Sequence, residues 1–141
     1  MRTGRVHGRR PIRRSGRRRA RVGGAAAAVG VALAAAVLRR VEVTGESMQP
    51  SLRPGDRLLV ARVPAAWPLR IGSLVAVPDP RSPRRLLVKR AVLTGPGWVD
   101  VRGDEPDRST DSRTFGPVPR RSVLGPVLYR YAPPGRTGRL R

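Results

Sequence analysis

The chain has 141 residues, which is room for one domain together with a tail or an anchor. It contains no cysteine and a single histidine, so the composition excludes a disulfide framework and a thiolate metal site, and it predicts neither a metal nor a cofactor. The net charge is +21, and all but one of the 30 basic residues are arginine.

The first segment, residues 1–21, carries ten arginines and no acidic residue. Such a segment cannot bury a core, and we expect a disordered tail on the cytoplasmic side of a membrane. The alternative is a polybasic segment that binds nucleic acid or anionic lipid, which would suit a non-catalytic protein. Because an apolar run follows directly, we favour the membrane flank and do not expect nucleic acid as a partner.

Residues 22–38 form a run of 17 residues without a charge, rich in alanine and glycine. As a helix it would be roughly 26 Å long, slightly shorter than the ~30 Å hydrocarbon core of a bilayer. Three interpretations stay open: an uncleaved transmembrane or signal-anchor helix, a cleaved signal peptide, or a helix packed on protein. We favour the anchor, a single pass through the cell membrane. The ten arginines before the run predict a cytoplasmic N-terminus and a C-terminal domain on the outer side.

Residues 39–131 contain short apolar runs separated by turns rich in glycine and proline. This spacing is typical of an all-β domain, a partly closed barrel or small sheet assembly. We expect a hairpin loop over the Pro- and Arg-rich residues 78–85 and a flexible C-terminal tail over 132–141. The predicted strands are 41–43, 57–63, 72–77, 86–93, 98–102 and 122–131.

Ser47 lies between two of these runs, in a segment flanked by glycine and proline. A serine is a nucleophile only if a nearby base takes its proton, and the single histidine, His7, lies in the arginine-rich tail. The alternative base is Lys89, the one lysine of the chain, which sits in an apolar run. Burial there would lower its pKa toward neutrality, whereas arginine keeps its proton. A lysine placed by chance with a solvated tip is the competing interpretation.

Three motifs then resemble the type I signal peptidase family, which are membrane-bound Ser/Lys endopeptidases. They are TGESMQPSLxxGD over 44–56, LVKRAV over 87–92 and RGDxxxxSxDSRxxGxV over 102–118. Their order and compatible spacing make the resemblance specific, and it covers about residues 41–131. It implies a small signal-peptidase-like catalytic β-core behind one N-terminal transmembrane or signal-anchor helix.

The resemblance also implies roles for individual residues. Ser47 would be the nucleophile, with its own backbone N–H as an oxyanion donor, and Lys89 the general base. Gly45 stands where some members have a hydroxyl, so the second oxyanion donor is unassigned. The supporting residues would be Ser109 (positioning the lysine), Asp111 and Arg113 (a structural pair), and Met48 and Pro50 (a turn on the substrate face). For Met48, plain core packing is an equal alternative.

The implied substrates are exported precursor proteins with small residues at the first and third positions before the cut. A second hypothesis comes from the short interval of 14 residues between Lys89 and Gly103. It is similar to small family members that mature a nickel-type superoxide dismutase, so the substrate could be one dedicated precursor. The expected partners are therefore precursor proteins and the lipid bilayer.

Overall fold

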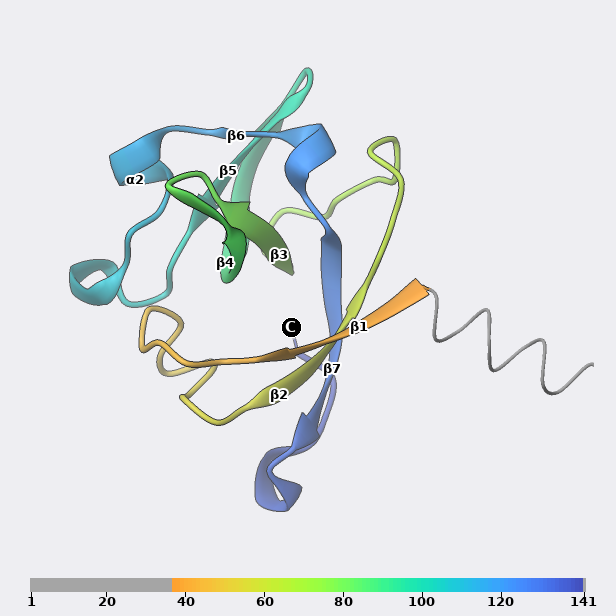
Figure 1. The fold of residues 1–141 in the computed structure, drawn as a ribbon, viewed down its shortest axis with the longest axis vertical. Coiled ribbons are helices and arrows are strands. Elements are labelled where there is room, and N and C mark those ends of the chain that lie inside the picture. The colour runs from red at the N-terminus through yellow and green to blue at the C-terminus, as the bar shows by residue number, and fades with distance from the viewer. Residues whose placement is uncertain (1–36, 141) are drawn as a thin grey trace, which may run out of the picture. The chain divides into compact units, whose positions relative to one another are not determined.

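A computed structural model describes residues 37–140 of the chain (Figure 1). Within these residues, seven antiparallel strands form one sheet in the order β1-β2-β7-β3-β4-β5-β6. The all-β prediction is confirmed for this part of the chain. The strands are β1 (Leu38–Glu42), β2 (Arg57–Ala61), β3 (Leu74–Asp79), β4 (Ser82–Gly95), β5 (Trp98–Arg102), β6 (Val118–Pro119) and β7 (Gly125–Ala132).

Helical segments between residues 37 and 140 are short: α2 (Ser112–Phe115) and three 3-10 turns, η1 (Pro106–Arg108), η2 (Arg120–Ser122) and η3 (Pro134–Arg136). None of the helices in this range has the length and apolar character needed to cross a membrane. The predicted tail over 1–21 and nearly all of the predicted anchor over 22–38 lie outside the described residues. Leu38, the last residue of the predicted anchor, begins β1, so this strand starts earlier than expected.

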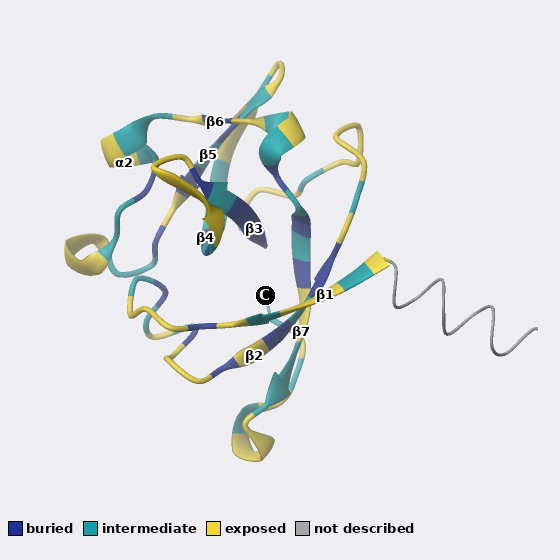
Figure 2. Cartoon of the chain, in the orientation of Figure 1, coloured by how far each residue is buried: buried dark blue, intermediate teal, exposed yellow. Residues whose placement is uncertain are grey.

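The strand β3 is buried on both faces over residues 74–77, and it is mostly dark in Figure 2. Side chains alternate along a strand, so Leu74 and Ala76 enter one apolar core while Val75 and Val77 enter a second. The first core is completed by the segment after β1 and by β2 and β7, and the second by β4, β5 and β6. A strand buried on both faces reads as a continuous apolar run, which is why this element was readable from sequence.

The hairpin predicted over residues 78–85 is present between β3 and β4, but its turn is much shorter than the predicted loop. β3 continues to Asp79 and β4 begins at Ser82, and these two residues are paired. The Asp79 carboxylate accepts hydrogen bonds from the backbone N–H and the side chain of Arg81, at 3.0 and 3.1 Å. An aspartate that binds the backbone two residues on is a turn-forming element, and the prolines lie where the strand edge needs no N–H donor.

The C-terminal residues 132–140 also differ from the predicted flexible tail. Backbone hydrogen bonds of 2.8 and 3.0 Å join Arg130 to Gly138. Arg130 and Arg136 both form ion pairs with the buried carboxylate of Asp56, at 3.2 and 3.1 Å. The segment is held because its Arg136, together with Arg130 of β7, neutralises a buried carboxylate in the turn before β2.

Candidate active site

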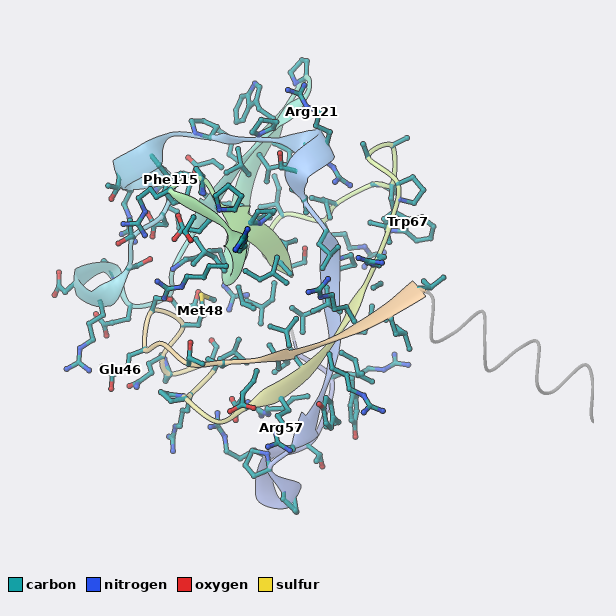
Figure 3. The ribbon with its side chains drawn as sticks, viewed as in Figure 1. Glu46, Met48, Arg57, Trp67, Phe115 and Arg121 are labelled. Carbon is teal, nitrogen blue, oxygen red and sulfur yellow. The ribbon has the colours of Figure 1, made fainter. Side chains whose placement is uncertain are left out.

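Ser47 is held on the connection between β1 and β2 by its neighbours in the chain. Met48 and Leu52, with 1% and 0% of their surface exposed, anchor this segment in the first core. The backbone N–H of Leu52 donates to the carbonyl of Met48 at 2.8 Å, and the carbonyl of Ser47 accepts from the N–H of Glu105 at 3.0 Å. Figure 3 labels Glu46 and Met48, the two chain neighbours of Ser47, on this segment. The backbone of the serine is therefore fixed on both sides.

Lys89 lies on β4, paired with Val75 of β3, and has only 2% of its surface exposed. Its amine donates a hydrogen bond to the Ser109 hydroxyl at 2.9 Å. Burial lowers the pKa of Lys89 from 10.5 to about 8, and the negative charge of Asp111 opposes part of this change. The neutral amine, which a base requires, is thus available at a lower pH than for a solvated lysine.

Behind the lysine, Ser109, Asp111 and Arg113 form a chain of hydrogen bonds. The Ser109 hydroxyl donates to Asp111 Oδ2 at 2.6 Å, and Arg113 Nη2 donates to the same oxygen at 2.6 Å. Asp111 also accepts from the N–H of Gly103 at 2.8 Å. Burial raises the pKa of Asp111, but these hydrogen bonds outweigh it and hold the pKa well below its usual range. Asp111 is therefore a fixed negative charge that orients the Ser109 hydroxyl.

Gly103 is the point at which the third motif approaches the serine segment. A Cβ atom at this position would lie 2.5 Å from the Ser47 carbonyl oxygen and would overlap the Ser109 hydroxyl. No side chain fits there, so the glycine permits the close approach. This contact brings the segment of Ser47 next to the segment of Ser109, whose hydroxyl accepts from Lys89.

Sequence reasoning did not assign Arg90 and Asp104 to the site. Arg90 donates to both carboxylate oxygens of Asp104 at 2.8 and 2.7 Å, to the carbonyl of Gly72 at 2.6 Å and to the Ser51 hydroxyl at 3.3 Å. Through these contacts Arg90 of the second motif binds Ser51 of the first motif and, as a bidentate pair, Asp104 of the third. The available signal was that a basic residue follows Lys89 in the second motif and an acidic residue follows Gly103 in the third.

Ser47 and Lys89 line the same two cavities, of about 50 and 110 Å³. The smaller one lies between residues 41–48 and residues 85–89. No hydrogen bond joins the Ser47 hydroxyl to Lys89 among the described residues; such contacts are often long before substrate binds. Between residues 37 and 140 there is no group of three or more His, Cys, Asp or Glu side chains that could hold a metal ion.

The remaining predicted residues fall into two groups. Asp111 and Arg113 form the predicted ion pair, at 2.6 Å. Met48 is buried in the first core and also lines the smaller cavity, so its core role is observed and its substrate role stays a prediction. Pro50 is exposed, and its assignment to the substrate face likewise stays a prediction.

Comparison with known proteins gives a consistent result. Residues 17–105 match the protein family described as signal peptidase, peptidase S26. The mitochondrial ATP-independent inner membrane protease subunit 1a of Arabidopsis thaliana is 33% identical over 129 residues, covering 74% of this chain and 77% of the relative. The mitochondrial inner membrane protease subunit 2 of Schizosaccharomyces pombe is 30% identical over 142 residues, and that of Mus musculus 31% over 143, each covering 79% of both chains. This chain belongs to the signal peptidase family and is a signal-peptidase-like protease.

Proposed function

We propose that the chain is a membrane-anchored serine endopeptidase that cleaves exported precursor proteins after small residues through a Ser47/Lys89 dyad. The observation that carries this proposal is the setting of Lys89. Its amine is almost fully buried, its pKa is lowered to about 8, and it lines the same cavities as Ser47. A buried lysine with a lowered pKa beside a hydroxyl is a recognised way to activate a serine.

In the first step, neutral Lys89 takes the proton of the Ser47 hydroxyl while Oγ attacks the carbonyl carbon of the scissile peptide bond. The backbone N–H of Ser47 donates to the resulting oxyanion. The intermediate collapses to an acyl-enzyme as protonated Lys89 gives its proton to the leaving amine. Lys89 then takes a proton from water, whose oxygen attacks the ester and releases Ser47.

Ser109 positions the lysine amine in this scheme. Its hydroxyl donates to Asp111 at 2.6 Å, which leaves its lone pairs free to accept from Lys89 at 2.9 Å. A hydroxyl suits this role because it holds the amine without adding a charge. A carboxylate in direct contact would raise the lysine pKa and keep the base protonated.

Two free strand edges support binding of an extended substrate. β1 is the first strand of the sheet, and only β2 pairs with it in the described residues. β4 pairs with β5 only from Arg90 onward, so the edge over 86–88 is unpaired on that side. The smaller cavity lies between these edges, and an extended peptide there could pair with both by its main chain. The small volume, about 50 Å³, favours small side chains.

A membrane location is supported by the relatives, which are inner membrane proteases of mitochondria by name. In this chain the apolar run 22–38 is the proposed anchor, and the arginines before it orient the N-terminus to the cytoplasm. The catalytic domain then lies on the outer side of the cell membrane. β1 begins at Leu38, the last residue of the run, which keeps the proposed site close to substrates that are themselves held in the bilayer.

The test is cleavage of a precursor with an Ala-x-Ala site by the membrane-reconstituted full chain, compared with Ser47→Ala and Lys89→Arg. We expect both variants to lose roughly 10⁴-fold or more of kcat. Ser122→Ala, a serine outside the site, is the matched control and should cleave normally. A Lys89→Arg variant that still cleaves would disprove the base assignment. A wild-type chain inert on this precursor would exclude the general processing role, and a nickel-type superoxide dismutase precursor would be the next substrate.

A further inference from the structure

The two cavities beside Ser47 share Arg85, Leu87 and Lys89 of β4 and differ in what else they take from this strand. Even-numbered β4 residues, Leu86 and Val88, line only the smaller cavity, and Val88 packs against the first core. From β4 the larger cavity receives only odd-numbered residues, Arg85, Leu87 and Lys89, of which Leu87 packs in the second core. Since strand side chains alternate between faces, the larger cavity lies on the odd-numbered face of β4, and only the smaller cavity also reaches the even-numbered face.

The larger cavity is strongly basic. Its lining includes Arg81, Arg85 and Arg108, against a single carboxylate, Glu46. Arg108 is paired with Glu46, and Arg81 with Asp79 at 3.0 Å. Arg85 is exposed and forms no hydrogen bond or ion pair within residues 37–140, although it lines both cavities. An arginine left without a carboxylate at the mouth of a site is available for one from a ligand.

We propose that this arginine-lined cavity selects precursors with an acidic side chain at the second position before the cut. The inference rests on the proposed function, in which the first and third positions place small side chains in the smaller cavity. In this arrangement those small side chains lie against Leu86 and Val88. The residue between them then points to the odd-numbered face of β4, where Arg85 lines the larger cavity together with Arg81 and Arg108. A carboxylate there pairs with Arg85, a neutral side chain gains nothing, and a lysine is repelled.

The cavity is open to solvent, so the preference should be moderate. Exposed ion pairs contribute a modest free energy, which corresponds to roughly a two- to fivefold difference in kcat/KM between a glutamate and a glutamine substrate. Added salt should reduce this ratio, because it screens exposed charges. The lysine substrate should be the poorest of the three.

The experiment measures kcat/KM of the full chain in neutral detergent for three peptides that differ only at the second position: Ala-Glu-Ala, Ala-Gln-Ala and Ala-Lys-Ala before the cut. We expect the order Glu, Gln, Lys. Arg85→Glu should reverse this order, and Arg85→Gln should give similar kcat/KM values for the three peptides. Arg121→Glu makes the same change of charge at an exposed arginine, which Figure 3 shows far from Glu46, and should keep the wild-type order. Ratios within each variant are compared, since Arg85 also affects the pKa of Lys89.

A binding experiment tests this inference independently of the dyad mechanism. Dissociation constants of the same peptides are measured on Ser47→Ala, which keeps the cavity intact. The glutamate peptide should bind more tightly than the lysine peptide even if no peptide is cleaved by the wild-type chain. Equal affinities for the three peptides, or an order that Arg85→Glu leaves unchanged, would overturn the proposal. A preference for acid only at the residue after the cut would overturn the assigned position.

Discussion

At the scale of single residues, the proposed dyad makes activity depend on the protonation of Lys89. Burial lowers its pKa from 10.5 to about 8. Only the neutral amine can take the Ser47 proton, so kcat/KM should rise with pH and reach half its maximum near pH 8. Peptide cleavage between pH 6 and 10 measures this directly.

The same measurement on Arg85→Gln provides a control for the cause of the shift. The positive charge of Arg85 lowers the Lys89 pKa, so its removal should move the midpoint to higher pH. Arg121→Gln, which removes a charge outside the site, should leave the midpoint in place. A rate that does not change between pH 7 and 9 would contradict Lys89 as the base.

Ser109 provides a second prediction at this scale. Replacing it by alanine removes the acceptor of the Lys89 amine and a donor to Asp111. Hydrogen bonds to charged groups contribute about 1.5–3 kcal/mol, so we expect kcat to fall roughly 10- to 100-fold while KM changes little. A rise in KM without a fall in kcat would mean that Ser109 acts on substrate binding instead. Thermal unfolding of the variant checks that the domain remains folded.

At the scale of elements, the C-terminal segment is held to the turn before β2 by Asp56. This carboxylate is 1% exposed and pairs with Arg130 and Arg136. Removing one member of a buried ion pair leaves the others without a partner, so Asp56→Ala should cost about 3 kcal/mol of the free energy of unfolding. For a domain of this size the Tm would fall by roughly 10 °C or more.

The matched control is the exposed pair of Glu42 and Arg57, whose side chains are 55% and 56% exposed. Glu42→Ala should cost at most about 1 kcal/mol, because solvent screens such pairs. Chemical denaturation of both variants compares the two values. Equal losses would mean that the Asp56 cluster does not hold the C-terminal segment.

The elements that sequence reasoning predicted correctly are those with a strong local signal. Trp98–Arg102 was predicted with the bounds it has in the structure, because apolar and polar residues alternate between two turns. The start of β4 was missed, since its prolines and arginines resemble a loop and the pairing with β3 depends on a turn closed by Asp79. The contact of Arg90 with Asp104 was missed for a similar reason: it depends on the register of β4 and β5. Such long-range pairings are not visible in local composition.

At the scale of the whole molecule, charge is divided unevenly between the segments of the chain. Residues 1–21 contain ten arginines, and the next 17 residues carry no charge. The composition separates these segments from the domain that follows, in which two apolar cores surround β3. The motifs identify the residues of the candidate site within that domain, whereas their contacts require the fold.

The predicted anchor leads to a test on the complete chain. After expression, the protein should stay in the membrane fraction through carbonate extraction, and its mass should correspond to an unprocessed N-terminus. A protease added from the outer side should reach residues after Leu38 but leave the arginine-rich tail intact, because a segment with ten positive charges is retained in the cytoplasm. Mature protein beginning near Arg39 or Val41 would show that the apolar run is a cleaved signal peptide. Changing four arginines of the tail to glutamine removes positive charge that orients the protein but leaves the domain itself unchanged. A smaller fraction of the domain should then lie on the outer side, while the purified enzyme keeps its activity on peptides.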